Sequence, residues 1–226
     1  DNMIDVNTYP ALEIEKITKA NRKIGLGIMG FADLLFRMRI PYSSKQALDL
    51  AGQLMKFINA ESKKASTALA ETRGPFPNFE KSIHNRRKNP LRNATTTAIA
   101  PTGTTSLIAD CSSGIEPLFA LSYTRKLMGG EQLLHVNKYF KEDAMFRGIY
   151  TEELMKKIAD ANSLAWFTEI PSDMRSIYAV SHEIPAKWHV MIQSAFQEHV
   201  DNGVSKSVNL KSSARKEDVV KIFKMA

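Results

Sequence analysis

Apolar residues recur every three to four positions along several stretches of the chain, a spacing that predicts helices. One helix is predicted over residues 10–38. A second runs from a capping box at residues 43–46 to Gly74, about 40 Å at about 1.5 Å per residue. Shorter helices are predicted from Thr151, which two acidic residues follow, and from Pro185 to an Asn-Gly pair at residues 202–203 that suits a left-handed cap.

Two stretches alternate in a way that suits strands instead. Residues 94–100 alternate Thr with small apolar side chains, and residues 204–210 place Ser205, Ser207 and Asn209 on one face. A turn is predicted between residues 101 and 106. The chain is therefore expected to be helix-rich with a few strands, in the α/β class.

Composition narrows the class of protein. The 226 residues are 43% hydrophobic and 24% charged, which is typical of a globular protein with one large or two small domains. The single cysteine, Cys111, excludes an intrachain disulfide and any redox chemistry that needs two thiols of this chain. No membrane span or signal peptide is expected, and the chain begins without methionine and ends inside an amphipathic pattern. We expect a cytoplasmic protein and a piece of a longer chain.

The net charge of +7 is concentrated in two stretches. Residues 81–100 hold five basic and no acidic side chains, and residues 206–226 hold six basic and two acidic ones. A surface for polyanions is one interpretation, and a solvated loop with a charged helix face is the favoured one.

Three motifs carry weaker chemical signals. Gly25, Gly27 and Gly30 spell the dinucleotide-binding fingerprint, but the residues before them predict a helix instead of the required strand, so close helix packing is favoured. The five histidines lack metal-ligand spacing, and no metal site is expected. Cys111 is interpreted as a small residue in a tight loop in preference to a nucleophile.

The strongest signal is a segment rich in hydroxyl groups that follows the predicted strand. Its glycine lets a ligand approach the backbone, and successive N–H groups there can converge on an anion. No lysine follows the glycine, so it is not a Walker P-loop. Phosphate binding and a plain hydroxyl-rich turn both remain open from the residues alone. The candidate residues are Pro101, Thr102, Gly103, Thr104, Thr105 and Ser106.

Four stretches of the chain form a recognisable set: Asn21–Asp33, Arg92–Ser106, Cys111–Phe119 and Ala195–Lys206. Taken together, they resemble the catalytic chain of ribonucleotide reductases, and most closely the adenosylcobalamin-dependent class (class II). The resemblance runs in order along essentially the whole chain, and the block from Arg92 to Phe119 is its most specific part.

The resemblance implies part of a ten-stranded α/β barrel of the ribonucleotide reductase/PFL-like type, incomplete here, with residues 1–226 as the later, C-terminal part of that single domain. It implies reduction of ribonucleoside diphosphates to 2′-deoxyribonucleotides by thiyl-radical chemistry, with adenosylcobalamin as cofactor. A thiol reductant such as thioredoxin is the implied partner of the full-length protein. A barrel cut in this way would expose strand edges, which invite pairing between copies, so a homodimer is expected. Residues 101–106 resemble the loop that holds the substrate's phosphates, and Glu116 is expected to have a structural role.

The chain also departs from the family pattern. The family's radical cysteine in an Asn-x-Cys-x-Glu setting and its pair of reducing cysteines are missing, because Cys111 matches none of the three. No catalytic residue is therefore assigned, and the chain alone is expected to be inactive. Two alternatives stay open: the large chain of the diiron-dependent class of the same family, and a basic nucleic-acid-binding module.

Overall fold

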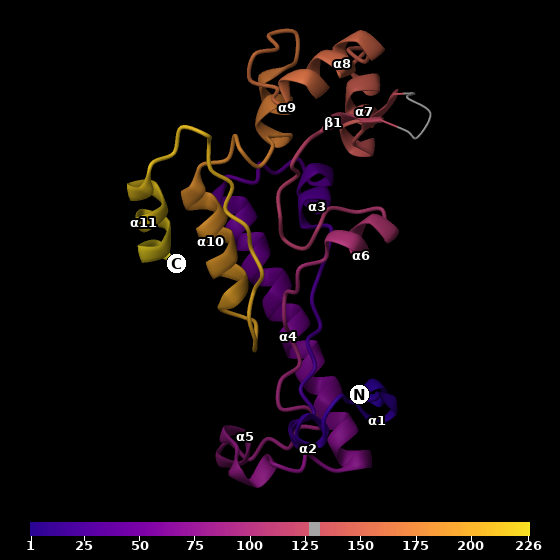
Figure 1. Cartoon of the computed structure of the whole chain (residues 1–226), viewed down its shortest axis with the longest axis vertical. Coiled ribbons are helices and arrows are strands. Elements are labelled where there is room, and N and C mark those ends of the chain that lie inside the picture. The colour runs from indigo at the N-terminus through magenta and orange to yellow at the C-terminus, as the bar shows by residue number, and fades with distance from the viewer. Residues whose placement is uncertain (127–131) are drawn as a thin grey trace. The chain divides into compact units, whose positions relative to one another are not determined.

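The computed structural model describes residues 1–126 and 132–226, which form two compact units. The first unit contains Asp1–Gly27, Ala51–Ala100 and Ala195–Ser205, and the second contains Ile28–Leu50, Pro101–Ser194 and Lys206–Ala226. The elements, drawn in Figure 1, are α1 (Asn2–Val6), α2 (Leu12–Asn21), α3 (Phe31–Arg37), α4 (Lys45–Arg73), η1 (Phe79–Lys81), α5 (Ile83–Arg86), α6 (Gly103–Ile108), β1 (Ser122–Lys126), β2 (Gln132–Val136), α7 (Lys138–Phe146), α8 (Glu152–Ala161), α9 (Ser172–Ile177), α10 (Ala186–Gln197) and α11 (Lys216–Met225).

Three extended segments lie side by side in the first unit, and the predicted strand over residues 94–100 is the middle one. On one side it pairs in parallel with residues 24–27. The Leu26 N–H donates to the Thr96 carbonyl at 2.8 Å, and the Ala98 N–H donates to the Leu26 carbonyl at 3.0 Å. The strand predicted over residues 94–100 is only partly correct: the segment pairs on both sides, but through isolated bridges at Thr97 and Ile99 and not as a continuous strand.

The third extended segment pairs with the other side of the middle one. The Ile99 N–H donates to the Gly203 carbonyl at 3.1 Å, and the Ser205 N–H donates to the Ile99 carbonyl at 2.8 Å. The strand predicted over residues 204–210 is only partly correct, because this pairing ends at Ser205 and no strand is assigned after it among the described residues.

The continuous helix predicted over residues 10–38 is wrong. Helix α2 ends at Asn21, Arg22 takes a left-handed conformation with φ of 48°, and a separate helix, α3, begins at Phe31. The residues after Arg22 are extended because their N–H groups pair with the middle segment instead of with the preceding turn. Tertiary pairing thus overrides the helical spacing of the apolar residues.

The long helix α4 confirms the second prediction with a shift at its start. Ser44, rather than Ser43, caps it, since the Ala47 N–H donates to the Ser44 hydroxyl at 3.1 Å. The helix ends at Arg73, and Gly74 follows with φ of +75°, a conformation that favours glycine.

The apolar stripe of α4 drifts around the helix. The predicted spacing of 3.5 residues puts Ala65 and Leu69 on the buried face, but the structure buries Ser66 and Ala70 to 2% and 6% exposure. A helix turns once in 3.6 residues, so a 3.5-residue stripe falls behind by about 20° in each heptad.

The helix predicted from Pro185 begins as expected but ends early. Helix α10 stops at Gln197, and Gly203 is not in the left-handed region. The Asn202 side chain instead donates to the Thr97 carbonyl at 2.9 Å and to the Thr95 hydroxyl at 3.1 Å. The Asn-Gly pair therefore hydrogen-bonds to the middle extended segment and does not cap α10.

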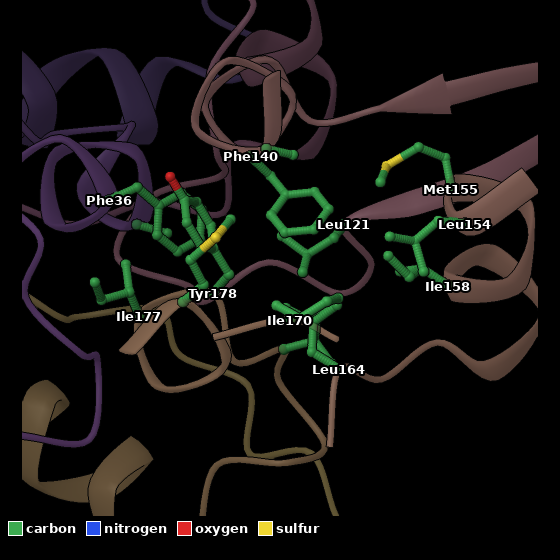
Figure 2. Close-up of a cluster of buried hydrophobic side chains, with 14 residues drawn as sticks. Phe36, Leu121, Phe140, Leu154, Met155, Ile158, Leu164, Ile170, Ile177 and Tyr178 are labelled. Carbon is green, nitrogen blue, oxygen red and sulfur yellow. The ribbon is translucent and has the colours of Figure 1, made fainter. Parts of the chain in front are cut away.

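The core of the second unit lies among α7, α8 and α9, which gather around β1 in Figure 1. Figure 2 shows Phe140 beside Leu121, and the ring centroids of Phe140 and Tyr178 are 5.1 Å apart. Helix α8 confirms the helix predicted from Thr151, whose hydroxyl accepts the Leu154 N–H at 3.1 Å. The buried members of this core are Ala32, Phe36, Leu121, Phe140, Ala144, Leu154, Met155, Ile158, Leu164, Ile170, Met174, Ile177, Tyr178 and Val180.

The antiparallel hairpin of β1 and β2 is an element that the sequence pattern did not predict. Tyr123 pairs with His135, and their rings stack with centroids 4.8 Å apart. Each strand has five residues and both carry polar side chains, so neither shows the clear alternation of a half-buried strand.

Candidate phosphate-binding site

The candidate loop, residues 101–106, includes the start of helix α6, where a turn was predicted. Thr102 precedes the helix, and its carbonyl accepts the Ser106 N–H at 2.8 Å. The N–H groups of residues 103–105 lie in the first turn, where a helix supplies no carbonyl partner. The segment therefore presents three backbone donors at a helix start.

These donors are open to solvent. Gly103, Thr104 and Thr105 are all exposed, and a Cβ added to Gly103 would meet no atom within 4 Å. Exposed N–H groups in a first turn carry partial positive charge, which favours a negatively charged ligand.

The hydroxyl groups of the loop divide into two kinds. The Thr102 hydroxyl accepts the Gly114 N–H at 2.9 Å and bonds the Ser113 hydroxyl at 3.1 Å. The buried Ser106 hydroxyl donates to the Gly103 carbonyl at 3.0 Å. These two side chains hold the loop's shape, whereas the remaining hydroxyls, of Thr104 and Thr105, are exposed. Pro101 is exposed too, and it has no N–H to donate.

A tight loop that includes Cys111 supports the start of α6. The Ser112 N–H donates to the Asp33 carboxylate at 2.5 Å, and the Ser112 carbonyl accepts the Gly30 N–H at 2.7 Å. Asp33 is 6% exposed, and Gly30 has φ of +79° with a potential Cβ only 3.5 Å from Cys111. The start of α3 thereby fixes the loop that carries Ser113 and Gly114.

A buried ion pair holds the same loop further along. The Lys206 ammonium donates to Glu116 at 2.5 Å and to His189 Nδ1 at 2.9 Å, and the Lys206 side chain is completely buried. The Glu116 carboxylate also accepts the Ser207 N–H at 2.7 Å. The structural role expected for Glu116 agrees with these contacts.

Cys111 offers little as a nucleophile. Burial, with a further contribution from the Asp33 carboxylate, raises the pKa of its thiol above the usual value, so the thiolate is disfavoured at neutral pH. A cavity of about 740 Å³ adjoins the residue and is lined by Ser106, Leu107, Lys138 and others. The exposed donors of residues 103–105 are not part of its lining.

The other candidate chemistry can be located as well. Within residues 1–126 and 132–226, no three His, Cys, Asp or Glu side chains lie close enough together to hold a metal ion. Of the basic residues between 81 and 92, Arg92 donates to the Asp1 carboxylate at 3.2 Å and to the Arg73 carbonyl at 3.0 Å. The other four, Lys81, Arg86, Arg87 and Lys88, are exposed.

The glycine motif is explained by close packing, but not between helices. A Cβ on Gly25 would lie 2.8 Å from the Ala98 Cβ, so the two extended segments approach too closely for a side chain. Gly27 packs against Ala98 in the same way. Gly25 and Gly27 thus lie inside a paired extended segment, where the expected helix was wrong, and both glycines face Ala98.

Asp33, Lys206 and His189 are the residues around this site that motif analysis did not single out. Lys206 is the one charged residue in the alternating stretch 204–210, an unusual position that could have marked it. His189 carries no such signal, because its partners come from distant parts of the chain.

Comparison with known proteins defines the class. The family model described as "Ribonucleotide reductase, barrel domain" matches residues 1–88 and 83–226. The chain belongs to the ribonucleotide reductase family, and the α/β barrel-domain fold expected from the resemblance is confirmed.

Individual relatives agree with this class. The chain is 47% identical over 226 residues to a vitamin B12-dependent ribonucleoside-diphosphate reductase of Thermoplasma acidophilum, covering 100% of this chain and 29% of the relative. It is 44% identical over 223 residues to a protein of the same name from Mycobacterium tuberculosis, covering 99% and 32%. The chain thus spans about a third or less of the length of these relatives.

A solved structure shows the same fold. The class Id ribonucleotide reductase alpha subunit of Actinobacillus ureae superposes with a TM-score of 0.83 at 20% identity, covering 99% of this chain and 41% of that one. Among the described residues, no helix is both long and apolar enough to cross a bilayer.

Proposed function

We propose that this chain is the later part of the barrel domain of a ribonucleoside-diphosphate reductase, and that residues 101–106 hold the substrate's phosphates. The observation that carries the proposal is the exposed first turn of α6, where three backbone N–H groups lack helical partners. Gly103, Thr104 and Thr105 supply these donors, and the hydroxyls of the two threonines add to them. Thr102 and Ser106 shape the loop, and Pro101 leads the chain into it.

The reaction proposed for the complete enzyme is reduction of a ribonucleoside diphosphate to the 2′-deoxyribonucleotide, with adenosylcobalamin as cofactor. The relatives named as vitamin B12-dependent are 44% to 47% identical, whereas the large subunit from Caenorhabditis elegans is 28% identical. The higher identity to relatives named as vitamin B12-dependent supports the cobalamin-dependent class. A thiol reductant such as thioredoxin, a homodimer and a cytoplasmic location belong to the same proposal.

The residues described here do not assemble a site for the cofactor's chemistry. When bound, adenosylcobalamin supplies a radical that must pass to a cysteine. The sole thiol of this chain is Cys111, whose pKa is raised by burial, and thiyl chemistry with two reducing thiols needs three cysteines. We therefore propose no catalytic role in radical chemistry for these side chains. The proposed contribution of this chain is to bind and orient the phosphates.

The test is nucleoside diphosphate binding to the 226-residue chain, followed through backbone amide NMR shifts. We expect the amides of residues 103–105 to shift most. Gly103→Ala should fold normally, because its Cβ meets no atom within 4 Å, but should weaken binding about fivefold by crowding the phosphate, a loss of about 1 kcal/mol. Gly203→Ala is the matched control, since its Cβ also meets nothing within 4 Å and it lies in the other unit.

Unperturbed amides at residues 103–105 in saturating nucleoside diphosphate would refute the phosphate-binding assignment. Salt-dependent binding of duplex or single-stranded DNA, lost on neutralising Arg86 and Arg87, would favour the nucleic-acid-binding module instead.

A further inference from the structure

Lys206 is an unusual lysine because its side chain has no exposed surface and every ammonium proton has an acceptor. Nζ donates to the Glu116 carboxylate at 2.5 Å, to His189 Nδ1 at 2.9 Å and to the Ser207 carbonyl at 2.5 Å. A lysine has three N–H donors, so the set is complete. The ammonium group is held in one position by three separate segments of the second unit.

His189 is fixed in one tautomer by the same arrangement. Its Nε2 lies 3.1 Å from the Ser181 carbonyl and must donate to it, so Nδ1 is the unprotonated nitrogen that accepts from Lys206. His189 is completely buried, and the Tyr42 ring lies against it with centroids 6.1 Å apart. The imidazole is therefore a neutral acceptor for the lysine.

Glu116 connects this cluster to the candidate phosphate loop. Its own N–H donates to the Ser113 carbonyl at 2.9 Å, which closes a turn over residues 113–116. Within this turn the Gly114 N–H donates to the Thr102 hydroxyl at 2.9 Å. Two hydrogen bonds, one from Glu116 to Ser113 and one from Gly114 to Thr102, therefore link Glu116 to the residue that precedes α6.

A buried ion pair adds little net stability, because the loss of hydration offsets the attraction of the charges. Its effect on geometry is larger. Glu116 is held at both carboxylate oxygens, by Lys206 and by the Ser207 N–H, so the turn that it belongs to has little freedom to move. A turn held in this way presents the Gly114 N–H to Thr102 at a constant position.

We infer that Lys206 and Glu116, with His189 as the neutral acceptor, are positioning residues for phosphate binding: they hold the 113–116 turn, and through Thr102 they fix the first turn of α6. The inference rests on the proposed function of residues 101–106. These three residues do not contact the phosphate, but they raise the affinity of residues 101–106 for it.

The experiment measures pyrophosphate binding to the 226-residue chain by calorimetry and by amide NMR, for the unaltered chain and for Lys206→Met and Glu116→Gln. Both variants keep the side-chain volume and remove one charge. We expect each to weaken pyrophosphate binding about tenfold, because weakening the charged hydrogen bond between Lys206 and Glu116 loosens the turn that positions Thr102. Hydrogen exchange at the Gly114 amide should become faster in both variants.

Lys63→Met is the matched control, because Lys63 also pairs with a largely buried carboxylate, that of Asp201, but in the other unit. It should lower thermal stability and leave pyrophosphate affinity within twofold. Glu116→Gln keeps the inference testable if Lys206→Met does not fold, since glutamine can still accept the Ser207 N–H. Pyrophosphate affinity within twofold of the unaltered chain in a folded Lys206→Met or Glu116→Gln variant overturns the inference.

A failure of the proposed function would give a different experimental result from a failure of the positioning inference. In that case pyrophosphate would leave the amides of residues 103–105 unshifted in the unaltered chain, before any variant is made, and the positioning inference would be overturned with it. Shifted amides in the unaltered chain together with unchanged affinity in either folded variant would overturn the positioning inference alone.

Discussion

The backbone of Gly27 passes so close to the Ala98 carbonyl that a Cβ on Gly27 would lie less than 3.0 Å from its oxygen. The neighbouring Leu26 is hydrogen-bonded to Thr96 and Ala98 of the same extended segment. The Gly27 backbone therefore cannot move away without breaking these hydrogen bonds. The glycine is therefore required by the contact between two extended segments. A motif with the spacing of a nucleotide-binding fingerprint is here a packing feature.

Gly27→Ala should destabilise the chain by about 2–3 kcal/mol, because the added methyl group forces the two segments apart. The free energy of unfolding in urea measures the effect. Gly203→Ala is the control, since its Cβ meets nothing within 4 Å, and it should change the unfolding free energy by less than about 0.5 kcal/mol. Equal effects of the two substitutions would contradict the packing explanation.

Asp201 should contribute to acid sensitivity. Burial raises the pKa of its carboxyl group, but hydrogen bonds from Lys63 and from the Thr96 N–H outweigh this, and the net pKa lies below the usual value. A carboxyl group with a lower pKa in the folded state stabilises the fold above its unfolded pKa, and this contribution is lost as the pH falls through the folded value.

Asp201→Asn should therefore lower the unfolding free energy at pH 7 by about 1–3 kcal/mol, the cost of a hydrogen-bonded charge. The difference from the unaltered chain should shrink as the pH is lowered from about 5 to about 2. Denaturant titrations across this pH range measure it. A difference that stays constant with pH would show that the carboxylate charge is unimportant.

Thr102→Val tests how far the hydrogen bond between Thr102 and Gly114 stabilises the loop. The substitution keeps the side-chain volume and removes the acceptor for the Gly114 N–H, at an expected cost of about 1–2 kcal/mol. Thr104→Val is the control for stability, because Thr104 is exposed, and it should cost less than about 0.5 kcal/mol. Thermal unfolding compares the two variants, and a stable Thr102→Val protein would mean that the Gly114 contact is dispensable.

His189 should make the second unit less stable in mild acid. Burial first, and the Lys206 charge second, lower the pKa of its imidazole below the usual value for histidine. Lys206 and Tyr42 face the ring, and the Glu116 carboxylate lies on the far side of the ammonium group. The unfolded chain, with the higher pKa, binds more protons below about pH 6.5, so stability falls as the pH falls through that range.

The measurement for His189 is an NMR titration of the ring protons, with urea unfolding of the unaltered chain and of His189→Gln between pH 5 and 7.5. The unaltered chain should lose more stability toward low pH than the variant, since glutamine does not titrate. A His189 pKa at or above 6.5 would contradict the neutral imidazole.

Local features of the sequence predict several elements correctly. Thr151 with its two following acids marks the start of α8, and Gly74 marks the end of α4, because caps depend on residues within one turn of the helix end. The segment around residues 94–100 reads as a strand because small and β-branched side chains suit a pleated backbone. These signals act over a few residues, and a sequence contains them in full.

Other features depend on residues far apart in the chain. The spacing of apolar residues 10–38 favours one helix, but backbone pairing of Leu26 with residues 96 and 98 breaks it. The burial of Lys206 depends on Glu116, which lies 90 positions earlier. No local pattern contains such pairs, because hydrogen bonds of distant partners form only when the fold brings them together.

The sequence by itself determined the family and the identity of the candidate phosphate loop, since both are carried by the residue order from Arg92 to Phe119. It also determined that one thiol is present where the family's chemistry uses three. The tertiary structure decided which of the loop's groups are open to a ligand and which hold the loop in place. Exposure and hydrogen-bond partners arise from packing, so Thr102 and Thr104, identical as residues, have different surroundings in the folded chain.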